Sequence, residues 1–226
     1  LVVLGMALQL RGHLFAGGAG LAKRHFQALW NYGLWVTVTG IVGPLMVYGD
    51  RFFVSAAVGA DQLPLYAIPQ DILLRLLLIP MALTGALLPR LAGMGVADTA
   101  QAYRQTYRRV GLAMLVICVL SAALAYPALL LWISQDFARS ALPVVLVLCV
   151  GVWVNSMASV PYTLLHAKGN PRLTALFHLA ELVLYVLALW LLSAQYGLVG
   201  AALAWLARVL LDWVLLHLAV RRLYGI

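Results

Sequence analysis

Charged residues are scarce in this sequence. Only 10% of its 226 residues are Asp, Glu, Lys or Arg, whereas 65% are hydrophobic, and the mean hydropathy is +0.98. A soluble domain carries about 25% charged residues, so this chain has too few of them to cover a surface that faces water. Long apolar runs alternate with short polar joints, which indicates that the lipid bilayer is the solvent of this protein.

Motifs for catalysis and for metal or nucleotide binding are missing as well. The sequence has no glycine-rich phosphate loop, no HExxH and no GxSxG. Its two cysteines, Cys118 and Cys149, each stand inside an apolar run without CxxC spacing. The joints are too short to house a catalytic domain. We therefore expect no enzyme, no cofactor and no metal site, and an integral-membrane transferase is a less favoured alternative.

The first residues of the chain lie inside an apolar run. Residues 1–10 are too few to cross a bilayer and lack the pattern of a signal peptide, so we interpret them as the tail of a truncated transmembrane helix. Residues 11–33 are polar, glycine-rich and basic, which favours a cytoplasmic linker. The sequence thus predicts a fragment of a longer protein.

Six apolar segments follow between residues 34 and 222, with a short tail at 223–226. Each has about 20 to 25 residues, enough to cross roughly 30 Å of hydrocarbon. The expected spans are Leu34–Val58, Pro64–Leu88, Val110–Ile133, Ala141–Leu165, Leu173–Ala194 and Leu198–Val220. The predicted fold class is therefore an all-α, polytopic membrane helix bundle.

Basic residues gather at alternate joints of this predicted bundle. One side holds Arg11, Lys23, Arg24, Arg90, Arg104, Arg108, Arg109, Lys168, Arg172, Arg221 and Arg222. The other side holds only Arg139, next to the acidic Asp61 and Asp136. The positive-inside rule assigns the basic side, with the C-terminus, to the cytoplasm. Because topology explains the basic charge, nucleic-acid binding is not expected.

Seven ionisable residues fall inside the spans, where a charge costs about 2.5–3.5 kcal/mol at the helix centre. They are Asp50, Arg51, Asp71, Arg75, Glu181, Arg208 and Asp212. Each hairpin can be folded about its turn to estimate which of these residues share a depth in the membrane.

Folding the first hairpin near position 62 brings Asp50 level with Arg75, and Arg51 close to Asp71. Asp71 and Arg75 are also one helical turn apart. These four residues are expected to form a crossed charge cluster.

Folding the last hairpin between positions 196 and 197 brings Glu181 level with Asp212, within reach of Arg208. His178 lies three residues before Glu181 on the same helical face, which allows a hydrogen bond between them.

Two interpretations of these clusters remain open. They are either neutralised ion pairs that hold helices together, or groups that line a cavity. Arginine suits a phosphate because its planar fork makes bidentate hydrogen bonds, so Arg51, Arg75 and Arg208 are the candidate substrate-binding residues. Asp50, Asp71, Glu181 and Asp212 are the candidate charge partners, or carriers of a proton or sodium ion that couples transport.

Four local motifs are spread over nearly the whole chain. They are Tyr48-Gly-Asp-Arg-Phe-Phe53, Leu87-Leu-Pro-Arg-Leu91, His166-Ala-Lys-Gly-Asn-Pro171 and Tyr196-Gly-Leu-Val-Gly-Ala-Ala-Leu-Ala204. In their order and spacing the chain resembles the C-terminal half of polysaccharide flippases of the multidrug/oligosaccharidyl-lipid/polysaccharide (MOP) exporter superfamily, the group of the O-antigen flippases.

This resemblance implies one lobe of a two-lobe transporter in the bacterial inner membrane. It implies a substrate, an undecaprenyl-pyrophosphate-linked oligosaccharide, that moves to the periplasmic leaflet by alternating access in lipopolysaccharide biosynthesis. The cavity arginines of such flippases are thought to meet the pyrophosphate. The implied partners are the missing N-terminal lobe, membrane lipids and other polysaccharide assembly proteins.

Two alternatives stay beside this one. A cation-coupled multidrug or small-molecule exporter of the same superfamily would have a cavity dominated by acidic and aromatic residues. A non-transporting membrane scaffold subunit would keep all three buried arginines sealed against carboxylates.

Overall fold

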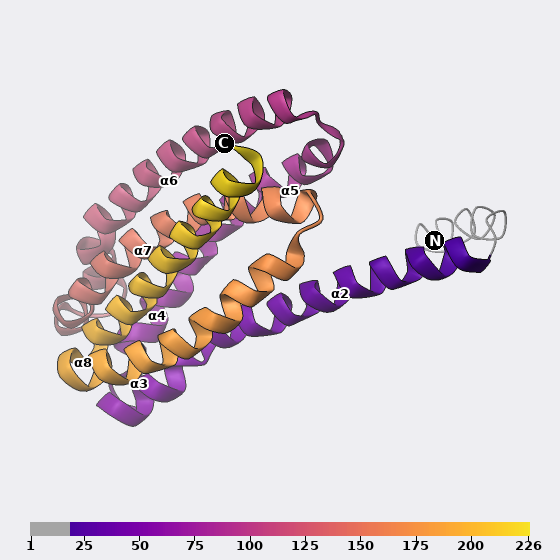
Figure 1. The fold of residues 1–226 in the computed structure, drawn as a ribbon. Coiled ribbons are helices and arrows are strands. Elements are labelled where there is room, and N and C mark those ends of the chain that lie inside the picture. The colour runs from indigo at the N-terminus through magenta and orange to yellow at the C-terminus, as the bar shows by residue number, and fades with distance from the viewer. Residues whose placement is uncertain (1–18) are drawn as a thin grey trace, which may run out of the picture.

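Nearly all of the described chain is helical. The computed structural model describes residues 19–226 and contains α2 (Ala19–Tyr48), α3 (Asp50–Val58), α4 (Leu63–Leu74), the 3-10 turn η1 (Arg75–Leu77), α5 (Leu78–Gly93), α6 (Val96–Trp132), α7 (Gln135–Ala167) and α8 (Pro171–Tyr224) (Figure 1). No strand occurs among these residues, which confirms the predicted all-α bundle. The predicted helix tail at 1–10 and the first part of the linker lie outside the described residues.

Five stretches of the described chain are long and apolar enough to cross a membrane. They cover Tyr32–Val58, Leu63–Leu87, Asp98–Trp132, Gln135–Ala167 and Pro171–Tyr224. The last has 54 residues, a length of about 80 Å at 1.5 Å per residue, and it reverses direction at Gly197 (Figure 1). Gly197 has φ 57° and ψ −133°, a conformation that glycine adopts without steric cost. Each half of α8 is thus long enough to cross the membrane, which agrees with the two separate spans expected there.

The first two crossings are each broken near their middle. Gly49 separates α2 from α3, and a Cβ atom at this position would lie 2.4 Å from the Leu45 carbonyl oxygen. The turn η1 separates α4 from α5 just before Pro80. Proline has no N–H to donate to the carbonyl four residues earlier, which is that of Leu76, so the helix tightens there. Both breaks lie close to the predicted charge cluster.

Several helices extend beyond the spans that the sequence predicted. α6 begins at Val96, so most of the basic segment between the second and third spans is helical. Its Ala, Gln and Arg residues are good helix formers in water, which explains why the helix continues past the apolar part. α2 likewise covers residues 19–33, and α7 begins at Gln135, where the Ser134 Oγ accepts a hydrogen bond of 3.2 Å from the Phe137 N–H.

Helix α7 lies at the centre of the bundle. It packs against α4, α5, α6 and α8, while α2 and α3 pack against α8. Two joints and the C-terminal end of α8 meet at one end of the molecule, because Lys168 Nζ donates to the Met94 carbonyl at 2.9 Å and Asn170 Nδ2 donates to the Tyr224 hydroxyl at 2.9 Å. This end carries the basic joints that the sequence singled out.

Candidate functional site

The first charge cluster lies where α3 and α4 face each other. The Arg51 Nη2 atom is 2.5 Å from the Asp71 Oδ1 atom, and their side chains are 27% and 46% exposed. The Arg51 guanidinium also lies over the Tyr48 ring, 5.2 Å from its centroid. The break at Gly49 lets Tyr48 and Arg51 meet across two helices. The Tyr48-Gly-Asp-Arg motif thus builds one side of this cluster.

Asp50 departs from the predicted crossed arrangement. It is fully buried and accepts hydrogen bonds from the Tyr66 hydroxyl at 2.6 Å and the Gln70 amide at 2.8 Å. The Tyr185 hydroxyl of α8 donates a third at 3.3 Å. Its expected partner Arg75 is exposed on η1, and no ion pair or hydrogen bond joins Arg75 to any side chain that the structure describes.

The geometry of a helix explains this difference. Consecutive residues such as Asp50 and Arg51 point about 100° apart around the axis, so they meet different side chains of α4. Counting residues from the turn at position 62 gives the depth of each group but not its direction. Arg51 therefore meets Asp71 as expected, whereas Asp50 points into the core, between Tyr66 and Gln70 of α4 and Tyr185 of α8.

The sequence missed the three hydrogen-bond donors around Asp50. Tyr66 and Gln70 stand four residues apart in the second span, a spacing that places both on one helical face and that could have drawn attention to them. No local signal exists for Tyr185, because it lies far away in the sequence. It reaches Asp50 only through the packing of α3 on α8.

The second cluster lies between the two halves of α8. The Arg208 Nε atom is 3.6 Å from the Glu181 Oε2 atom, and the His178 Nε2 atom is 3.6 Å from the Asp212 Oδ1 atom. The predicted Arg208–Glu181 pair is confirmed. The sequence allowed a hydrogen bond between His178 and Glu181, whereas in the structure His178 lies at ion-pair distance from Asp212. All four side chains are buried, with Glu181 1% and Arg208 8% exposed.

This buried cluster leaves several polar atoms without a partner. Two carboxylates face one guanidinium, and both Glu181 oxygens, the Asp212 Oδ1 and the His178 Nδ1 lack a hydrogen-bond partner. His178, Glu181 and Asp212 each offer one ligand atom, and these atoms lie within 4.8 Å of one another. Folding the last hairpin about its turn brings these three residues together from the sequence alone, although no metal site was expected from their spacing.

A tyrosine connects the two clusters. Tyr185 is four residues after Glu181 on α8, so the two side chains share one helical face, and its hydroxyl binds Asp50 on α3. A buried polar layer thus runs from the Asp50 carboxylate to the Glu181–Arg208 pair. Arg51, Asp71 and Arg75 lie on the outer side of this layer.

The chain is similar to a known protein along nearly its whole length. Over 228 aligned residues, which cover 99% of the chain, the sequence is 34% identical to the Shigella flexneri protein named "Putative O-antigen transporter". The match takes up 54% of that protein, so the chain spans about half the length of this curated relative. No family model and no solved structure matches the chain.

The match agrees with the features predicted from the sequence. A transporter relative supports the expectation that the chain is not an enzyme, and several membrane-crossing helices together with a bacterial relative support a multi-pass protein of the inner membrane. The resemblance to O-antigen flippases that the four motifs indicated is confirmed, and the chain fits a C-terminal part of such a transporter.

Proposed function

We propose that the chain forms one lobe of a flippase that moves an undecaprenyl-pyrophosphate-linked oligosaccharide across the inner membrane by alternating access. The observation that carries the proposal is the exposed Arg75, which lies within a membrane crossing and has no partner among the described side chains. A cation held in hydrocarbon needs a partner or a watery cavity. The anionic pyrophosphate of a lipid-linked substrate would supply that partner in the loaded transporter.

Arg51 is the second group proposed to meet the pyrophosphate. Its pair with Asp71 is half exposed, so a more highly charged anion can compete for the guanidinium without first unpacking the core. Arg208 differs, because it is 8% exposed and lies against Glu181. We assign Arg51 and Arg75 to the substrate and Arg208 to the buried cluster.

The Glu181–Asp212 pair is proposed as the ion-coupling site. The cluster places two carboxyl groups beside one guanidinium, and a net negative charge would be costly at this depth. One proton or one monovalent cation would neutralise it, and the neighbouring guanidinium disfavours a divalent ion. Asp50, whose carboxylate is already held by three donors, would relay the change to α3.

The basic end of the molecule is proposed to face the cytoplasm. The joints held together by Lys168 and Asn170 carry the excess of Lys and Arg, and such an excess marks the cytoplasmic side. Alkaline phosphatase fused after Ile226 should be inactive, whereas green fluorescent protein fused there should fluoresce. The reverse pattern would overturn this orientation.

Replacing Arg75 tests the substrate-binding role. In the native protein, expressed from its own gene, Arg75→Ala should abolish surface polysaccharide while the amount of membrane protein stays normal, and Arg75→Lys should restore part of it. The matched control is Arg139→Ala, an exposed arginine near the start of α7. Normal polysaccharide from Arg75→Ala would contradict the proposed contact.

A multidrug exporter is the second candidate, and one feature favours it. A cavity of about 290 Å³ between α2, α3 and α8 is lined by Asp50, Phe52, Phe53 and Tyr185, among others, an acidic and aromatic set that suits a cationic drug. Drug sensitivity of a deletion strain with normal surface polysaccharide would favour this candidate.

The partnerless Arg75 weighs against the third alternative, a membrane scaffold in which every buried arginine is paired with a carboxylate.

A further inference from the structure

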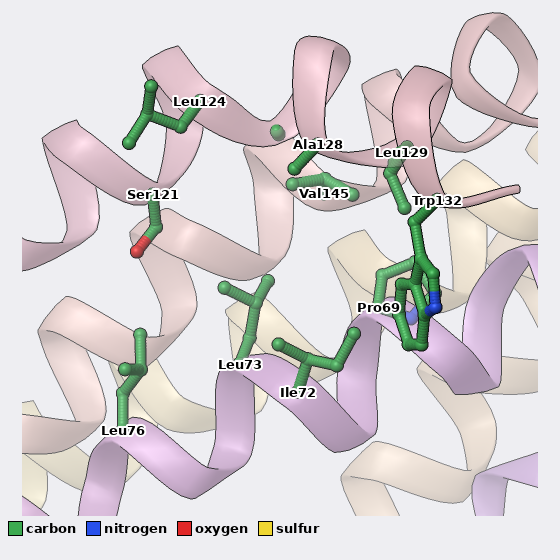
Figure 2. A pocket seen from close by; sticks show the side chains of 11 residues that line it. Pro69, Ile72, Leu73, Leu76, Ser121, Leu124, Ala128, Leu129, Trp132 and Val145 are labelled. Carbon is green, nitrogen blue, oxygen red and sulfur yellow. The ribbon is translucent and has the colours of Figure 1, made fainter. Parts of the chain in front are cut away.

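An apolar groove lies between α4 and α6, with α7 as its floor. Its volume is about 290 Å³, and it is lined by Pro69, Ile72, Leu73, Leu76, Ser121, Leu124, Ala125, Ala128, Leu129, Trp132 and Val145 (Figure 2). Ser121 is the single hydroxyl among these side chains. All the lining residues belong to stretches that are apolar enough to cross a membrane, so the groove lies at the depth of the hydrocarbon.

The groove shares a helix with the exposed charges. Ile72, which lines it and is 43% exposed, precedes Arg75 by three residues, a spacing that puts both on neighbouring parts of one face. Asp71, the partner of Arg51, is the residue before Ile72. The apolar groove and the two arginines Arg75 and Arg51 therefore border the same exposed stripe of α4 and η1.

The depth of this arrangement distinguishes between possible occupants. Arg75 is twelve residues from the start of α4 at Leu63, which is about 18 Å along a helix and therefore well inside roughly 30 Å of hydrocarbon. A resident phospholipid keeps its phosphate at the surface of the bilayer. Only a lipid whose head group is crossing the membrane brings a phosphate to the depth of Arg75.

We propose that this groove holds the isoprenoid chain of the lipid-linked substrate while its pyrophosphate meets Arg75 and Arg51. The inference rests on the proposed flippase function and adds a separate binding site for the chain. An isoprenoid in the groove keeps its contacts with apolar side chains while the charged head passes alongside. The groove thus anchors the substrate by its tail during the crossing, independently of its sugars.

Ala128 offers a way to fill the groove without disturbing the core. It is exposed and lines the groove, whereas Ala123 is exposed on the same helix and does not. Figure 2 shows Ala128 beside Val145, between the α6 residues Leu124 and Leu129. The paired variants Ala128→Phe and Ala123→Phe therefore place the same ring inside and outside the groove.

The test measures binding to the purified native protein in lipid nanodiscs, with undecaprenyl pyrophosphate and inorganic pyrophosphate as probes. Ala128→Phe should weaken binding of undecaprenyl pyrophosphate at least about tenfold, a loss of about 1.4 kcal/mol, and leave inorganic pyrophosphate unchanged. Arg75→Ala should weaken both probes. Equal affinities of Ala128→Phe and Ala123→Phe for undecaprenyl pyrophosphate would contradict binding of the isoprenoid chain in the groove, and would not affect the proposed flippase function.

A second measurement avoids any effect of the larger residue on folding. Ala128→Cys is purified in its folded state and then modified with benzyl methanethiosulfonate, with Ala123→Cys as the control; the native Cys118 and Cys149 are buried. Modification at position 128 should lower the affinity for undecaprenyl pyrophosphate, and an unchanged affinity would overturn the groove. If the wild-type protein binds undecaprenyl pyrophosphate no better than phosphatidylglycerol, the flippase function itself fails.

Discussion

The two charge clusters differ most in their exposure. Arg51 and Asp71 form a half-exposed pair at the edge of α3 and α4, while Glu181, Arg208, Asp212 and His178 are enclosed between the halves of α8. Both clusters were predicted from the same rule, that charges inside a membrane must find partners. The clusters differ in packing: an external molecule can reach the Arg51–Asp71 pair, whereas only a proton or a small ion can reach the cluster between the halves of α8.

Because of this difference in exposure, arginine has two different roles in the two clusters. An exposed arginine can exchange one anion for another at small cost, because solvent or substrate screens it. A buried arginine holds a carboxylate whose removal leaves an uncompensated charge. The exposed cluster is therefore suited to substrate and the enclosed one to coupling, and mutations should affect them differently.

The largest effect is expected for Arg208→Ala. It leaves Glu181 and Asp212 facing each other in a buried site, and breaking such a pair costs about 3–5 kcal/mol. We expect a strong loss of folded protein in the membrane and a lower midpoint in detergent unfolding. Arg51→Ala breaks the more exposed pair and should cost less than this.

Removing both members of the buried pair sharpens this comparison. The double variant Glu181→Gln/Arg208→Gln has no unpaired arginine or glutamate, so it should recover much of the stability that Arg208→Ala loses. A double variant as unstable as the single one would show that the site is held by packing and not by charge. Equal losses from Arg208→Ala and Arg51→Ala would remove the distinction between the clusters.

A loss of coupling without a loss of folding is expected for Glu181→Gln. This variant removes one of the two carboxyl groups of the enclosed cluster, so export should become less sensitive to external pH or sodium, whichever ion the wild type uses. Surface polysaccharide is measured across a range of each, with Asp61→Asn, an exposed acid in the short loop before α4, as the control. Unchanged ion dependence in Glu181→Gln would contradict the coupling role.

A smaller effect is expected for Tyr66→Phe. The buried Asp50 carboxylate would lose its shortest hydrogen bond, and a buried polar group left short of a partner costs about 1–3 kcal/mol. Tyr196→Phe, at an exposed position, should be neutral in the same unfolding measurement. Equal stabilities of the two variants would mean that Gln70 and Tyr185 hold Asp50 without Tyr66.

The sequence predicted the membrane depth of each charged residue better than the direction in which its side chain points. Hydropathy located the crossings, and counting from each turn brought Arg51 to Asp71 and Glu181 to Arg208, because the rise per residue of a helix is nearly constant. It could not predict that Asp50 turns away from Arg75, since that depends on rotation about the axis and on the breaks at Gly49 and η1. Tyr185 was out of reach because only tertiary packing brings it to Asp50.

The smallest effect on stability is expected for Asp71→Asn. Asp71 is the most exposed member of the described ion pairs, with 46% of its side chain exposed, and an amide at this position can still accept a hydrogen bond from Arg51, so the amount of protein and its unfolding midpoint should barely change. Binding of inorganic pyrophosphate should nevertheless strengthen, because Arg51 loses its competing carboxylate. Arg139 has no such partner among the described side chains, and Asp136→Asn close to it in sequence should leave binding unchanged. A weaker affinity in Asp71→Asn would mean that Asp71 positions Arg51 for the anion instead of competing with it, and the exposed cluster would then be as preorganised as the enclosed one.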